Sequence, residues 1–79
     1  MSENKWLSGK IKLVNSERKT GIIKQYDGQD VVFNFVDVDD DVENITAQVR
    51  KLEGKKVLYN LEQTNIGQQA KKIMIMDKD

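Results

Sequence analysis

The stretch that decides the fold is "ERKTGIIKQYDGQDVVFNF", residues 17–35. Two segments rich in apolar residues, 21–26 and 30–36, flank the dipeptide Asp27-Gly28, which is typical of a tight hairpin turn. The second segment is rich in β-branched and aromatic residues, as strands are. Its side chains on one face are Val31, Phe33 and Phe35. The stretch therefore predicts a β-hairpin.

Three further segments alternate apolar and polar residues in the same way, namely 9–14, 55–63 and 70–77. Five short strands in 79 residues predict a single domain, 1–79, with its core in about 9–76. We expect an all-β fold, a small five-stranded antiparallel OB-type barrel, with a small SH3-like barrel as the alternative. The expected core residues are Val31, Phe33, Val57, Tyr59, Leu61 and Ile73.

The connection between the third and fourth strands has a different period. Apolar residues recur there at three- and four-residue steps, at Val42, Ile45, Val49 and Leu52. This spacing predicts a short helix within 41–52, started by one of the aspartates 39–41 and ended at Gly54. We expect its apolar stripe to cover the core rather than to bind a partner.

The composition argues against catalysis. The chain has no histidine and no cysteine, so the commonest bases, nucleophiles and metal ligands are absent. The acidic run 37–44 lacks the glycine-centred loop of an EF-hand. We therefore expect no enzyme activity, no cofactor and no metal site. No secretion signal or membrane-length apolar run is present, so we expect a cytoplasmic protein without membrane association.

Four motifs resemble the bacterial cold-shock domain family. These are "GKIKLVNSERKTGII" (9–23), "DVVFNF" (30–35), "LEGKKVLYNLEQ" (52–63) and "GQQAKKI" (67–73). The resemblance covers about residues 9–75, and the connection after the third strand is longer here. It implies an OB-type barrel that binds single-stranded RNA or DNA.

The chain departs from that family where bases would stack. The family's aromatic positions fall on Leu13, Val14, Thr20, Ile22 and Val32, and its histidine falls on Asn34. Base–aromatic stacking is worth about 1–3 kcal/mol per base. Loss of several rings predicts weak binding that depends mainly on charge. The formal net charge of zero also counts against a strong nucleic-acid binder.

The candidate nucleic-acid-binding residues are Lys10, Lys12, Asn15, Arg18, Lys19, Lys24, Asn34 and Phe35. Each has a plainer interpretation. The basic side chains can be ordinary surface charges, Asn15 can stabilise a turn, and Phe35 can belong to the core. Trp6 can cover one end of the barrel, replace a lost stacking ring or anchor a partner.

A second class of function stays open. The substituted positions would form an apolar patch on the barrel, made of Leu13, Val14, Ile22 and Val32. Exposed apolar patches often mark interfaces. The alternative prediction is therefore a protein-interaction module, or a homodimer, that has lost nucleic-acid binding.

Overall fold

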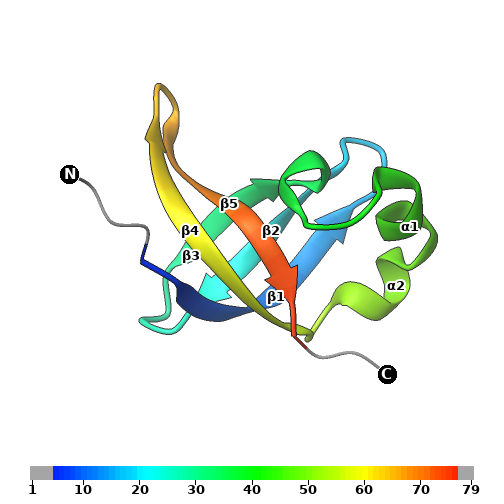
Figure 1. The fold of residues 1–79 in the computed structure, drawn as a ribbon, viewed down its shortest axis with the longest axis horizontal. Coiled ribbons are helices and arrows are strands. Elements are labelled where there is room, and N and C mark those ends of the chain that lie inside the picture. Colours follow the sequence, from blue (N-terminus) through cyan, green and yellow to red (C-terminus); the bar gives the residue numbers. More distant parts are fainter. Residues whose placement is uncertain (1–4, 77–79) are drawn as a thin grey trace.

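The computed structural model describes residues 5–76, and over that range the chain is all-β, with a closed barrel of five strands and only short helices (Figure 1). The strands are β1 (Leu7–Asn15), β2 (Thr20–Gln25), β3 (Asp30–Asn34), β4 (Lys56–Thr64) and β5 (Gly67–Ile75). Their order around the barrel is β1-β2-β3-β5-β4, which is consistent with an OB-type barrel.

One strand pair corrects the expectation of an antiparallel barrel. The pair β3–β5 is parallel, with Phe33 opposite Ala70, whereas the other four pairs are antiparallel. The reason is geometric, because strand directions cannot alternate all the way around a closed ring with an odd number of strands. One pair of neighbours must then run in the same direction.

A β-bulge in β1 determines which of its side chains face outward. Ile11 is opposite Ile23, but Leu13 is already opposite Ile22, so Lys12 is the extra residue. Ile23 is buried and Ile22 lies on the other face of β2. The bulge therefore places Leu13 on the outer surface and Val14 on the side of the core.

The core fills the barrel interior and continues under the helical connection. Five of the six expected core residues are buried, and the sixth, Leu61, packs against the core while partly exposed. The remaining buried hydrophobic side chains are Ile11, Ile23, Phe35, Val38, Ile45, Leu52 and Ala70. The rings of Phe33 and Phe35 are stacked, with 6.3 Å between their centroids.

The connection after β3 contains the expected helix in two short pieces. A 3-10 turn, η1 (Phe35–Asp37), is followed by α1 (Val42–Ala47) and α2 (Val49–Leu52). Ile45 and Leu52 are buried, so the apolar stripe covers the core, as predicted. Gly54 follows α2 with a φ of +89°, a conformation that favours glycine. Both helices lie at one end of the barrel, beside the end of β1 (Figure 1).

The third strand is shorter than the sequence predicts. It ends at Asn34 rather than at residue 36, because the chain turns there into η1, where the amide of Val38 donates a hydrogen bond to the carbonyl of Phe35. No helix within residues 5–76 is long and apolar enough to cross a membrane.

Candidate nucleic-acid interface

Three lysines from three neighbouring strands stand side by side on the outside of the barrel. Lys10 of β1 is directly opposite Lys24 of β2 on one side and Lys56 of β4 on the other. All three side chains are exposed, because their neighbours along the strands, such as Ile11, are the ones that face the core. We call Lys24, Lys10 and Lys56 the lysine row.

Repulsion between the ammonium groups of the lysine row destabilises the folded state. Directly opposite residues in antiparallel strands have Cα atoms about 4.5–5.5 Å apart, and like charges there are destabilising. Within residues 5–76, none of the three ammonium groups has an ion-pair or hydrogen-bond partner. The row is therefore a concentrated positive charge that an anion can neutralise.

The row is bounded on its β3 side by an acidic residue. Lys24 is opposite Asp30, and the Asp30 carboxylate accepts a hydrogen bond from the ammonium group of Lys12 at 2.9 Å. Lys12 is thus the one predicted binding lysine that has an ion-pair partner in the described part of the chain. Exposed pairs of this kind are weak, about 0–1 kcal/mol, so an anion can compete for Lys12.

The next row along the strands is apolar. Leu13, Ile22 and Val32 follow one another across β1, β2 and β3, and two of them, Leu13 and Val32, are 41% and 45% exposed. We call these three residues the apolar row. Val14 does not belong to it, which corrects the predicted patch, since Val14 is opposite buried Gly21 and packs against the core.

The β1–β2 loop holds two of the predicted residues in structural roles. The side-chain oxygen of Asn15 accepts hydrogen bonds from the amides of Glu17 and Arg18, at 3.0 and 3.1 Å. The Lys19 ammonium group donates to the carbonyl of Ser16 at 3.1 Å. Asn15 therefore stabilises the turn, while the exposed Arg18 side chain has no hydrogen-bond or ion-pair partner within residues 5–76 and is available to a phosphate.

The last two predicted residues are in different environments. Asn34 is half-buried and lies opposite Thr20, in line with Asn15. Phe35 is fully buried and stacked on Phe33, so its ring is not accessible to a base. Phe35 was predicted either to contact nucleic acid or to belong to the core, and in the structure it belongs to the core.

Sequence reasoning missed Lys56. Its segment, 55–63, reads as an ordinary strand, and its relevance follows only from the register that sets it opposite Lys10. Lys24 and Lys10 were predicted as contacts, but their adjacency also depends on that register. Within one strand, alternation shows that a lysine faces outward but not which charge lies beside it.

Residues 5–76 contain no cluster of three or more carboxylate, histidine or cysteine side chains that could hold a metal ion. A scan against protein-family models matches no family.

Proposed function

We propose that the protein is a nucleic-acid-binding module that binds single-stranded RNA or DNA weakly and with little sequence preference. The proposal includes the cold-shock-like character suggested by the sequence motifs and a cytoplasmic setting. The observation that carries it is the lysine row, because three adjacent unpaired cations are a site for a polyanion. The exposed Arg18 side chain and the weakly paired Lys12 add to this positive surface.

Phosphate contacts should supply most of the affinity. Non-specific binding of this kind has dissociation constants of about 10⁻⁴–10⁻⁶ M. If the three row lysines each contact one phosphate of a single strand, the slope of log K against log salt is about −2. Binding by charge and binding by an apolar surface therefore differ in their salt dependence.

The test is a titration with single-stranded RNA and DNA oligomers at several salt concentrations. The variant Lys10→Ala/Lys24→Ala should weaken binding at least tenfold and flatten the salt slope. The matched control is Arg50→Ala/Lys51→Ala, which removes the same charge from exposed positions on α2. The proposal fails if wild type does not bind at millimolar concentration in low salt, or if both variants lose the same amount of affinity for the oligomers.

The apolar row favours a second candidate function, a protein-interaction or self-associating module. Leu13, Ile22 and Val32 form a continuous strip across three strands, in which Leu13 and Val32 are exposed and Ile22 is half-buried. Analytical ultracentrifugation of wild type and Ile22→Lys tests the self-associating form. A concentration-dependent dimer that Ile22→Lys disperses would support it, and a monomer throughout would exclude it.

A further inference from the structure

We infer that the bound strand follows the lysine row from β2 across β1 onto β4 rather than running over β3, and that an outer pocket beside Trp6 receives one of its bases. The lysine row would hold the phosphates. The base would carry an exocyclic amino group, as cytosine does and thymine does not. This inference rests on the proposed function and specifies where and how the ligand is held.

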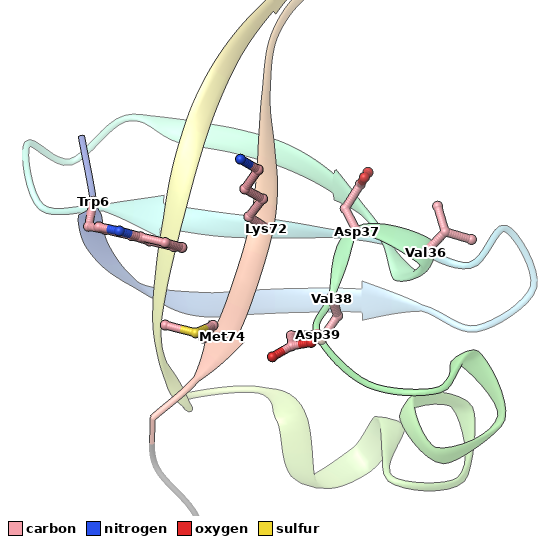
Figure 2. A pocket seen from close by; sticks show the side chains of 7 residues that line it. All are labelled: Trp6, Val36, Asp37, Val38, Asp39, Lys72 and Met74. Atoms are coloured by element: carbon pink, nitrogen blue, oxygen red, sulfur yellow. The ribbon is translucent and has the colours of Figure 1, made fainter. Parts of the chain in front are cut away.

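The pocket lies against the outer surface of β5. It has a volume of about 340 Å³ and is lined by Trp6, Val36, Asp37, Val38, Asp39, Lys72 and Met74. Figure 2 shows Trp6 on one side and the segment that bears the two carboxylates on the other, with Lys72 and Met74 on β5 between them. An aromatic ring, a thioether, a cation and carboxylates therefore border one space.

The pocket and the lysine row both lie on the outside of the barrel and are linked through β4, because Lys56 is two residues from Leu58, which is opposite Met74 of the pocket. Leu7 is opposite Tyr59, whose side chain is fully buried, so alternation turns Trp6 outward, as it does Ser8 and Lys10. Trp6 and Lys10 are four residues apart, about 13 Å at the rise of a β-strand. A short single strand with phosphates on the row can reach the pocket.

The residues around the pocket have the chemistry to hold a base. The Trp6 side chain is 47% exposed, so its ring has a face free for stacking. Asp39 is exposed and its carboxylate has no hydrogen-bond partner within residues 5–76, so it can accept from an amino group. Lys72 can donate to a base carbonyl.

Asp37 is less available for this role. Its carboxylate pairs with the ammonium group of Lys71 at 3.2 Å, and both side chains are half-buried. The pair fixes the wall of the pocket beside Val36 and Val38. Discrimination between bases should therefore depend on Asp39.

The alternative path, from β2 onto β3, is less favourable for a polyanion. Asp30 closes the lysine row on that side, and the apolar row offers no cation. In the other direction, Lys56 extends the row onto β4. A cationic peptide is the other chemistry that a tryptophan and a carboxylate could bind, but Lys72 and the lysine row would repel it.

Trp6 is the only tryptophan in the chain, so its fluorescence reports directly on the pocket. We would titrate oligo(dC) and oligo(dT) of equal length at low salt. Oligo(dC) should quench the fluorescence and bind several-fold tighter than oligo(dT), and Asp39→Ala should abolish that preference. Trp6→Leu should weaken oligo(dC) binding on the order of tenfold.

The path is tested separately with Lys56→Ala, for which Lys51→Ala is the matched control. Lys56→Ala should weaken both oligomers, and Lys51→Ala should leave both unchanged. Binding that leaves the fluorescence unaltered and tolerates Lys56→Ala would overturn this inference while the proposed function stands. Absence of any binding would overturn both. Quenching by an oligolysine peptide but by neither oligomer would assign the pocket to a protein partner and overturn the inference.

Discussion

The ring of Phe33 occupies the space that a side chain at Gly21 would need. The two residues are directly opposite each other in β2 and β3, and a Cβ atom built on Gly21 would lie 2.5 Å from two ring atoms of Phe33. Real Cβ contacts are never that short. Because both residues are buried, the ring has no solvent-filled space into which it can move. The hairpin thus depends on glycine at this position.

Gly21→Ala should destabilise the protein. Overpacking a core costs about 1–3 kcal/mol, and the reduced entropy of the unfolded chain returns only about 0.4–1 kcal/mol. Chemical denaturation followed by circular dichroism measures the difference. Gln29→Ala, at an exposed position of the adjoining loop, is the control and should be neutral. A Gly21→Ala variant as stable as wild type would show that the ring can relocate.

Phe33→Ala should leave the chain largely unfolded at 37 °C. Truncating a buried phenylalanine costs about 3–5 kcal/mol. A chain of this size has a total stability of about 4–12 kcal/mol. Val32→Ala changes the neighbouring residue, which is 45% exposed, and should cost much less. Thermal melting of both variants gives the comparison, and a cooperatively folded Phe33→Ala protein would contradict the prediction.

Local patterns in the sequence were sufficient to predict the strands and the helix, but not to predict which strands pair with each other. Alternation predicted all five strands, and the helical spacing predicted the helical connection between β3 and β4, because each signal lies within one segment. The parallel β3–β5 pair and the position of Lys56 beside Lys10 depend on contacts between distant segments. No single segment contains that information.

The bulge at Lys12 explains why Val14, which was predicted to lie in the surface patch, packs against the core instead. The consecutive apolar residues Leu13 and Val14 break the alternation of β1, which is the only sequence sign that a residue has been inserted. Strict alternation from buried Ile11 would turn Leu13 inward and Val14 outward, and the bulge reverses both placements. Similarly, the pocket beside Trp6 combines residues from three distant segments.

The stability of the protein should decrease at alkaline pH because of Tyr59. Burial raises the pKa of the Tyr59 phenol above its usual value of 10.0, and the negative charge of Asp27 raises that pKa further. The hydroxyl group donates a hydrogen bond to the side chain of Gln25 at 3.0 Å. Above pH 10 the unfolded state loses the phenol proton that the folded state still keeps, which favours unfolding. The contribution of Tyr59 to stability is therefore fully present below pH 10.

As the pH rises above 10 toward the raised pKa of Tyr59, the free energy of unfolding should fall. Urea denaturation across that range measures the loss. Tyr59→Phe should show a smaller decrease, since it has no phenol to ionise, although loss of the bond to Gln25 costs about 0.5–1.5 kcal/mol at neutral pH. Tyr26→Phe, at a position 95% exposed, should retain the wild-type pH dependence. Equal pH profiles for all three proteins would exclude this role of Tyr59.

Restoring rings on β2 and β3 should create a second binding surface. Thr20 and Val32 lie on the outer face of the hairpin, opposite Asn34 and Ile22. Thr20→Phe/Val32→Phe adds two stacking platforms worth about 1–3 kcal/mol per base, so affinity for oligo(dT) should rise at least tenfold. The salt slope should stay unchanged, because stacking releases no counterions. The matched control is Thr20→Ile/Val32→Ile, which enlarges the same positions without rings and should bind as wild type does. If the phenylalanine and isoleucine variants bind equally, a strand held by the lysine row does not reach this face.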